Sequence, residues 1–206
     1  MAMRGKLTPD RIIETAMQML DADGVDTFTM RKLAGALDVD PMAIYHYHKN
    51  KAALLNAVIQ AMLGTCNVPE PSDEWTQDIR RLCAGIRDLA NRHPGTFRIY
   101  ETYDEWVPAE HRIHNAFHAT LLRAGFCHTK AAQGVRVLLA YTESFAVDEV
   151  TGWLDAEDRS ELEASLSQGN FPALKLLIDQ FVTSNPDADF EFGLNVLIRG
   201  LEGELP

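Results

Sequence analysis

Apolar residues recur at helical spacing along most of the chain, and no segment shows the strict alternation that is typical of a half-buried strand. The first helix is predicted to begin at Thr8-Pro9-Asp10, which offers a side-chain cap, a proline at the first helical position and an acid near the positive end of the helix dipole. Gly24 ends this helix. Its apolar positions are Ile12, Ile13, Ala16, Met17 and Leu20.

Three further helices are predicted in the N-terminal part. Thr29 can cap a short helix over 30–37, Asp40-Pro41 begins one that runs to about Tyr47, and Asn50 caps a fourth. The segment 64–73 contains Pro69 and Pro71, and therefore predicts the boundary between a first domain, 1–64, and a second domain, 65–206.

The second domain is also predicted to be helical. Ser72 can cap a long helix with an apolar stripe, and His93-Pro94-Gly95 ends that helix. Further helices are expected over 95–103, 108–124, 129–152, 160–166, 171–183 and 186–205. The sequence therefore predicts an all-α fold.

The net charge of −11 opposes binding to a polyanion such as DNA, unless the acids lie away from the contact surface. Residues 1–64 hold 7 Lys+Arg and 7 Asp+Glu, which gives this part a net charge of 0. Residues 65–206 hold the other 12 Lys+Arg and 23 Asp+Glu. The acidity thus belongs to the second domain, and the first can still present a local basic surface.

Other features of the sequence bear on the environment of the protein. Cys66, Cys83 and Cys127 show no paired spacing, which fits a reducing cytoplasm better than a disulfide framework. No run of 18 uncharged apolar residues is present, and the first seven residues precede no apolar core. We therefore expect a cytoplasmic protein with no membrane partner.

Residues 29–48 contain two short predicted helices joined by a turn at 38–40. Such a pair can place its second helix in the major groove of DNA, where base edges are distinguishable. The turn alone does not separate this helix-turn-helix from an αα-hairpin of any helical protein, and at this point both interpretations remain open.

The residues around the turn are more specific. Thr29, Arg31-Lys32-Leu33-Ala34, Leu37 and Val39 are followed by Ile44-Tyr45, Tyr47, Lys49-Asn50-Lys51 and Leu54-Leu55. In this spacing they resemble the DNA-binding domain of the tetracycline-repressor (TetR) family over about residues 7–63. Residues 190–194 and 198–202 resemble the closing helix of the C-terminal domain of the tetracycline repressors.

The resemblance implies a transcriptional repressor. In this family a homodimer binds a palindromic operator in double-stranded DNA and is released by a small organic effector. A ligand-binding activator or a protein that only sequesters its ligand is the alternative.

The resemblance also assigns roles in the first domain. Arg31 corresponds to a base-reading arginine, which can bridge O6 and N7 of guanine. The positions that meet bases in the recognition helix are Pro41, Met42, Tyr45 and His46, although His46 fits a plain surface residue equally well. The positions near phosphate are Thr29, Ala43, Tyr47 and Lys51. Lys49 adds long-range attraction, and Arg4 and Lys6 can form a basic arm on the duplex. Because Tyr45 and Tyr47 cannot both face the core, we expect Tyr47 to be the partly buried one.

For the second domain the resemblance implies ligand binding and dimerisation. The predicted helix 129–152 is apolar around most of its circumference, as expected of a helix that packs on its own domain and on a partner. With helix 186–205 it is predicted to form a four-helix bundle with a second copy. Burial of both helices inside one subunit is the alternative.

The ligand pocket is expected among aromatic and polar residues near the middle of the second domain. The candidates are Phe97, Tyr100, Thr102, Tyr103, Trp106, Phe117, Tyr141 and Phe145, each of which could instead be an ordinary core residue. Glu143 is predicted to lie on an apolar helix face beside Leu139 and Ala146. A carboxylate there needs a partner, such as a cationic or hydroxylated ligand or an arginine across the dimer.

Several departures and absences restrict the chemistry. The drug-binding histidines of the tetracycline repressors correspond here to Ile99 and Asn67, which argues against tetracycline with magnesium, although Thr102 matches the family. His111, His114 and His118 could share a metal ion, but the apolar opposite face of their helix favours a solvated histidine face. We therefore expect no metal and no cofactor.

The sequence contains no phosphate-binding glycine loop, nucleophile elbow or His-Glu-x-x-His helix, and it indicates no enzyme.

Overall fold

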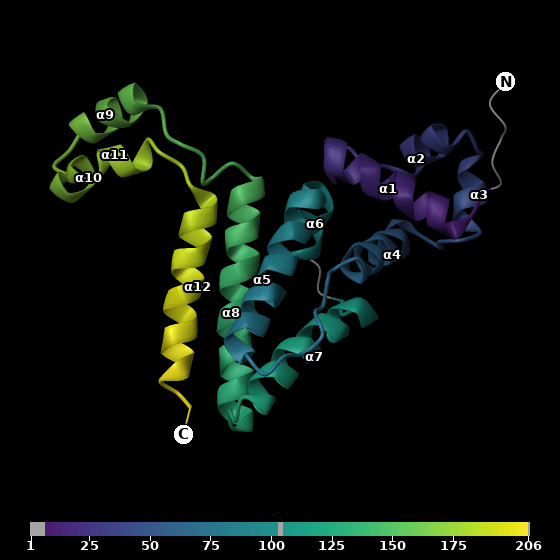
Figure 1. Ribbon diagram of the computed structural model, residues 1–206. Coiled ribbons are helices and arrows are strands. Elements are labelled where there is room, and N and C mark those ends of the chain that lie inside the picture. Colours follow the sequence, from purple (N-terminus) through teal and green to yellow (C-terminus); the bar gives the residue numbers. More distant parts are fainter. Residues whose placement is uncertain (1–6, 103–104, 206) are drawn as a thin grey trace.

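The computed structural model describes residues 7–102 and 105–205, and these residues form helices and no strand (Figure 1). The N-terminal bundle consists of α1 (Pro9–Asp23), α2 (Met30–Leu37), α3 (Pro41–Tyr45) and α4 (Lys51–Gly64). The C-terminal bundle consists of α5 (Trp75–Arg92), α6 (Pro94–Tyr100), α7 (Pro108–Arg123), α8 (His128–Val150), α9 (Arg159–Ser167), α10 (Pro172–Leu176), α11 (Ile178–Phe181) and α12 (Pro186–Glu202). The predicted all-α fold is confirmed.

Side-chain caps begin the helices of the N-terminal bundle, as the sequence predicts. The hydroxyl of Thr8 accepts from the N–H of Arg11 at 3.2 Å, and the side chain of Asn50 accepts from the N–H of Ala53 at 2.7 Å. Asp38, with φ 54, makes the left-handed turn between α2 and α3. The core between these helices is formed by Ile12, Leu20, Leu33, Ile44 and Leu54, all 0% exposed.

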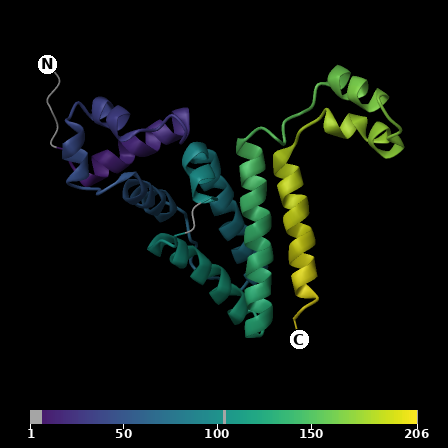
Figure 2. The same cartoon turned by 180° about the vertical axis from the view of Figure 1, so that it is seen from behind.

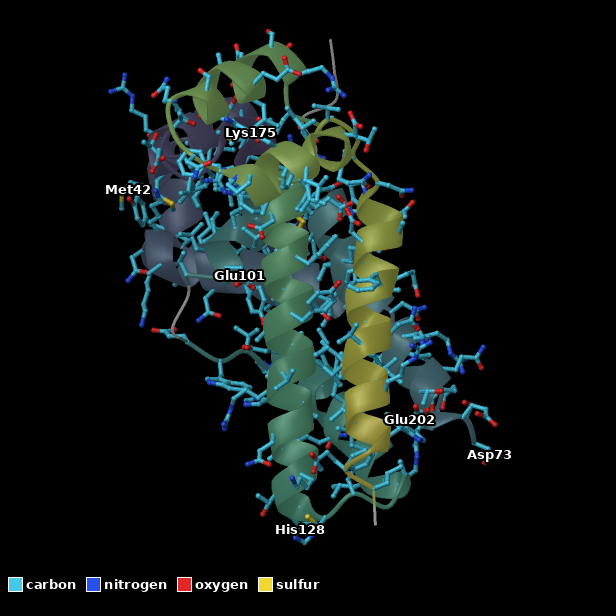
Figure 3. All side chains as sticks on the ribbon, turned by 90° about the vertical axis from the view of Figure 1, so that its left-hand side faces the viewer. Met42, Asp73, Glu101, His128, Lys175 and Glu202 are labelled. Atoms are coloured by element: carbon cyan, nitrogen blue, oxygen red, sulfur yellow. The ribbon has the colours of Figure 1, made fainter. Side chains whose placement is uncertain are left out.

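The C-terminal bundle is built around α5, α7 and α8, with α12 antiparallel beside α8 (Figures 1 and 2). Figure 3 shows α8 and α12 side by side on the face turned away from the N-terminal bundle, with His128 and Glu202 toward the same end. The segment α9–α11 projects from the opposite end of this pair. No helix within the described ranges is both long and apolar enough to cross a membrane.

Some predicted helix limits are wrong. The segment 171–183 forms two short helices, because neither α10 nor α11 buries a residue and a single helix there would lack the packing that supports a longer one. The third helix ends at Tyr45, two residues early, because the carbonyl of Ile44 accepts from the N–H groups of both Tyr47 and His48 and tightens the last turn. At the C-terminal end α12 stops at Glu202.

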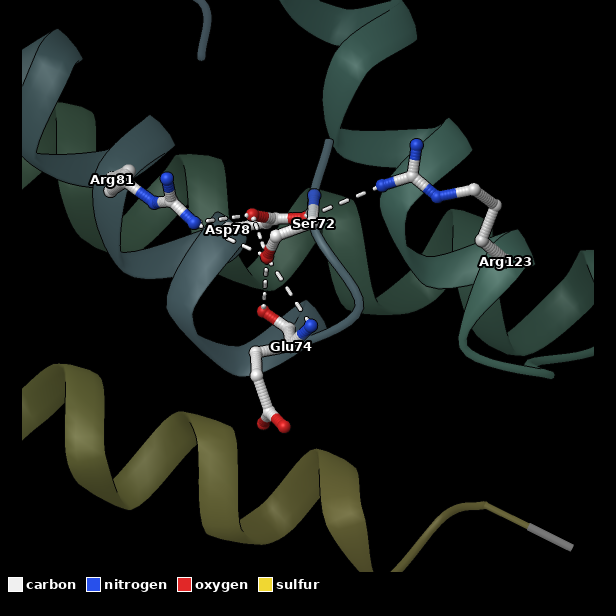
Figure 4. A network of polar contacts seen from close by, with 5 residues as sticks. All are labelled: Ser72, Glu74, Asp78, Arg81 and Arg123. Atoms are coloured by element: carbon white, nitrogen blue, oxygen red, sulfur yellow. Dashed lines mark hydrogen bonds and ion pairs between the residues drawn. The ribbon is translucent and has the colours of Figure 1, made fainter. Parts of the chain in front are cut away.

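Ser72 is not the cap of α5, contrary to the prediction. Its hydroxyl and its N–H both donate to the carboxylate of Asp78 at 2.8 Å (Figure 4). Asp78 is 1% exposed and also pairs with Arg81 at 2.9 Å and with Arg123 of α7 at 3.3 Å. Burial alone would raise the pKa of Asp78, but the hydrogen bonds from Ser72 and the two arginines lower it. The network joins the start of α5 to the end of α7.

Candidate functional site

The short helix α3 presents its side chains outward from the N-terminal bundle. Met42 is 63% exposed, Tyr45 40% and Tyr47 45%, whereas Ile44 is fully buried. Arg31 at the start of α2 and Lys49 after α3 are exposed as well. A helix with this exposure can enter the major groove, and flanking cations can meet the phosphates.

Tyr47, which follows α3, is no more buried than Tyr45, so the expectation that Tyr47 is the partly buried tyrosine is wrong. Ile44 already fills the core position on this side of α3. The hydroxyl of Tyr47 donates to the carbonyl of Leu7 at 3.1 Å and so ties the turn after α3 to the residues before α1.

Lys51 begins α4, but its ammonium is directed into the protein. It donates to the carbonyl of Phe28 at 2.9 Å and to that of Val25 at 3.4 Å, and it lies 5.4 Å from the centre of the Phe28 ring. A phosphate contact by this ammonium would have to share it with those carbonyls. Arg4 and Lys6 lie outside the described residues.

A small cavity lies where helices α4, α5, α6, α7 and α8 converge. Its lining residues are Leu63, Ile86, Leu89, Phe97, Tyr100, Glu110, Ile113, His114 and Glu143. Its free volume is about 10 Å³, close to what one water molecule needs. An organic ligand that enters this cavity must therefore move its walls apart.

The polar groups of the cavity form one connected cluster. The hydroxyl of Tyr100 lies 3.3 Å from a carboxylate oxygen of Glu110 and 3.3 Å from one of Glu143. The imidazole of His114 lies 3.9 Å from Glu110. Burial raises the pKa of Glu143 to about 8, with the charges of Glu101 and Glu110 acting in the same direction and the Tyr100 hydrogen bond opposing them. Burial also lowers the pKa of His114, which keeps its ring neutral.

Of the residues expected in the pocket, the structure brings Phe97 and Tyr100 to this cavity. Phe117 is 0% exposed in the core, and Thr102 lies instead on a separate hollow with Gly24 and Arg98.

The remaining candidates lie elsewhere. Tyr141 and Phe145 pack on Phe190 of α12, with ring centres 5.7 Å and 5.2 Å from it. Trp106 is 57% exposed and stacks on His111 at 5.1 Å. Tyr103 lies outside the described residues.

Sequence reasoning missed Glu110, His114 and Leu63 as cavity residues. The i,i+4 spacing of Glu110 and His114 was the available signal, because it places both on one face of α7. The expected solvated histidine face is wrong for His114, whose side chain is 23% exposed and touches the ring of Trp106 at 4.8 Å between centres. Within the described residues no group of three or more metal-binding side chains is suited to an ion.

The N-terminal bundle docks on the C-terminal bundle through α1 and α6. The carboxylate of Asp21 accepts from the N–H of Thr96 at 2.8 Å and lies 2.9 Å from the His93 ring nitrogen. Gly95 lies so close to α1 that a Cβ there would be 2.0 Å from the carbonyl oxygen of Leu20. The helix that carries Phe97 and Tyr100 of the cavity is thus fixed directly to the N-terminal bundle.

The outer face of α8 and α12 carries an open apolar groove. Val137 is 48% exposed and Val196 is 55% exposed along it, with Gly134, Leu197 and Leu201 also lining it. Leu194 is 0% exposed within the single chain. The two helices therefore pack on each other inside one subunit and still leave apolar surface outside.

Comparison with known proteins agrees with this architecture. The family described as "Bacterial regulatory proteins, tetR family" matches residues 12–58, and "Tetracyclin repressor-like, C-terminal domain" matches residues 68–205. The class A tetracycline repressor from transposon 1721 of Escherichia coli is 35% identical, with 95% of this chain and 91% of that protein covered.

Solved structures of ActR from Streptomyces coelicolor are similar as well. Apo ActR has a TM-score of 0.83 at 27% identity and covers 97% of each chain. ActR in complex with actinorhodin has a TM-score of 0.81 at 27% identity, with 97% of this chain and 99% of that chain covered. The chain belongs to the TetR family and is a DNA-binding transcriptional repressor that responds to a ligand.

Proposed function

We propose that two copies of this chain form a cytoplasmic dimer that binds a palindromic operator in double-stranded DNA, and that a small organic effector in the five-helix cavity releases it. The observation that carries this proposal is the position of the cavity. Its walls include Leu63 at the end of α4 and Phe97 and Tyr100 of α6, and both helices contact the N-terminal bundle or belong to it. The relative ActR, bound to actinorhodin, supports an organic effector.

In this proposal α3 is the recognition helix. Arg31 reads a guanine, and the other base contacts come from Pro41, Met42 and Tyr45 of α3 and from His46, which directly follows it. The phosphate contacts come from Thr29, Ala43, Tyr47, Lys49 and Lys51. Because the hydroxyl of Thr29 accepts the N–H of Lys32 at 3.2 Å, its own proton is left to donate to a phosphate.

The dimer forms through the outer face of α8 and α12. Exposed valines on a groove between two long helices suit burial against the same face of a second copy, since a two-fold dimer pairs identical surfaces. The four helices then form a bundle. The pair holds two copies of α3 at a separation that suits successive turns of the major groove.

Effector binding changes that separation. An organic molecule needs a pocket of several hundred Å³, so the cavity must widen, and the displaced walls are α4 and α6. Since α6 is hydrogen-bonded to Asp21 of α1, its displacement tilts the N-terminal bundle. The coupling is reciprocal, so operator DNA weakens effector binding by the same factor.

The experiment is a fluorescence titration of full-length protein against the DNA upstream of its own gene and against random DNA. Arg31→Ala is expected to weaken the binding free energy by about 1–3 kcal/mol on the operator and by little on random DNA, because a contact to a specific base is lost. Arg159→Ala, on the projecting segment, is the control and leaves both affinities unchanged. Equal losses on both DNAs for Arg31→Ala would contradict its base-reading role, and no preference of the wild type for the upstream DNA would refute the repressor mechanism.

A further inference from the structure

We infer that the effector is an organic cation, an apolar or aromatic skeleton bearing a protonated amine that Glu143 and Glu110 bind together. This inference rests on the proposed function of the cavity and names the class of ligand. It follows from the charges, the donors and the aromatic rings that line the cavity.

The cavity has acidic groups and no basic counterpart. Two of its nine lining residues are carboxylic acids, and none is Lys or Arg. The neighbouring arginines are committed elsewhere. Arg112 donates to the carbonyls that end α4, including that of Leu63 at 3.2 Å, and Arg87 holds Glu149 at 2.6 Å. Among the described residues, no Lys or Arg is paired with either carboxyl group of the cavity, and His114 is the nearest basic side chain to Glu110.

The two carboxyl groups also have few hydrogen-bond donors. Tyr100 has one O–H proton and lies 3.3 Å from each carboxylate, so it can donate to only one of them at a time. The N–H of Val107 reaches Glu110 only at 3.5 Å, and His114 is 3.9 Å away. A protonated amine supplies up to three donors and the missing positive charge, and it can bridge both carboxylates.

The remaining lining fits the rest of such a molecule. Phe97, Tyr100 and His114 present aromatic rings, and a cation near ring faces gains additional electrostatic stabilisation. The other walls are aliphatic, formed by Leu63, Ile86, Leu89 and Ile113. An anionic effector would meet the carboxylate of Glu110 in a poorly hydrated site, and a neutral one would give that carboxylate no counter-charge.

Binding of a cation has a protonic signature. The titratable groups around Glu143 are Tyr100 and Glu101, Glu110 and His114 of α7, and the buried thiol of Cys83 on α5. The residues of α4 and α5 that line the cavity itself are aliphatic. With a pKa of about 8, the Glu143 carboxyl is mostly protonated at neutral pH. A bound ammonium favours the carboxylate, so binding expels up to about one proton.

The test compares three probes with the same ring system: naphthylmethylamine, naphthalenemethanol and naphthoate. Their binding to the full-length protein is measured by calorimetry in two buffers of different ionisation enthalpy. We expect the amine to bind at least about tenfold more tightly than the alcohol, with proton release, and naphthoate to bind least. Glu143→Gln keeps the shape and is expected to weaken the amine about tenfold or more while the alcohol stays within about twofold.

Glu161→Gln on the projecting segment is the control and should leave all three affinities unchanged. A preference for the alcohol or for naphthoate, an unchanged amine affinity in Glu143→Gln, or no amine binding at about 1 mM would overturn the inference. Operator binding by the same preparations separates the two proposals. If the wild type binds its operator and these results fail, only the ligand class is wrong, whereas absence of operator binding refutes the proposed function itself.

Discussion

Replacing Gly95 with alanine tests the docking of α6 on α1. A Cβ at this position would lie 2.0 Å from the carbonyl oxygen of Leu20, 2.7 Å from the carbonyl carbon and 2.8 Å from the Cα of Asp21. All three are backbone atoms, so no side-chain rotation can relieve the contact. The two helices must therefore separate or the backbone must distort.

The size of the effect follows from these distances. Ordinary contact begins at 3.4 Å, so the Cβ and the Leu20 oxygen must move apart by about 1.4 Å. Overpacking of this kind costs about 1–3 kcal/mol. The same movement strains the hydrogen bonds of Asp21 to Thr96 at 2.8 Å and to His93 at 2.9 Å, each worth about 1 kcal/mol. We expect a total of about 3 kcal/mol, which lowers the melting temperature by about 6–12 °C in a chain of this size.

The assay is thermal unfolding followed by circular dichroism, together with operator titration at a temperature where the variant is folded. Because the position of the N-terminal bundle depends on α6, we also expect weaker operator binding. Gly64→Ala is the matched control, since a Cβ at the end of α4 meets no atom within 4 Å. A Gly95→Ala protein with the melting temperature and operator affinity of the wild type would refute the proposed contact between these helices.

Three other substitutions test the network, the cavity and the groove. Asp78→Asn should lower the free energy of unfolding, measured by chemical denaturation, by about 2 kcal/mol, because charge-assisted hydrogen bonds are lost. An unchanged denaturation midpoint would contradict the stabilising role of this network. The folded-state pKa of Glu143 is raised from 4.5 to about 8, so the wild type should lose stability as the pH rises through this range, whereas Glu143→Gln should not. Identical melting profiles of the wild type at about pH 6 and about pH 9 would contradict a buried carboxyl group at this position. Val196→Arg should convert the dimer to a monomer in sedimentation, because it buries an unpaired charge, and a dimer of wild-type affinity would move the interface elsewhere.

Local sequence determined much of the N-terminal bundle. The caps at Thr8, Thr29 and Asn50 are each made by a side chain and an N–H three residues later, so the neighbouring residues suffice to place the start of a helix. The turn at Asp38 is local in the same way. The helix-turn-helix pattern and the family resemblance are read from contiguous residues, and comparison with known proteins confirmed the family.

Tertiary structure decided what helical periodicity leaves open. Periodicity gives the buried side of a helix but not the residue opposite it, so Tyr141 and Phe145 could not be separated in advance from Phe97 and Tyr100, although the first pair meets α12 and the second lines the cavity. The prediction that Ser72 caps α5 failed because its hydroxyl binds the carboxylate of Asp78 instead. Asp78 lies six residues further along the chain, whereas a cap bonds to an N–H two or three residues away.

The cavity itself depends entirely on long-range packing. Its polar cluster joins Tyr100, Glu110 and Glu143, which lie on three helices and meet only when those helices pack together. The sequence showed that Glu143 needs a partner on an apolar face, because that follows from the spacing along one helix. Only the tertiary structure could supply the partner's identity, because the free energy of a buried carboxylate is set by the atoms around it in space and not by its neighbours along the chain.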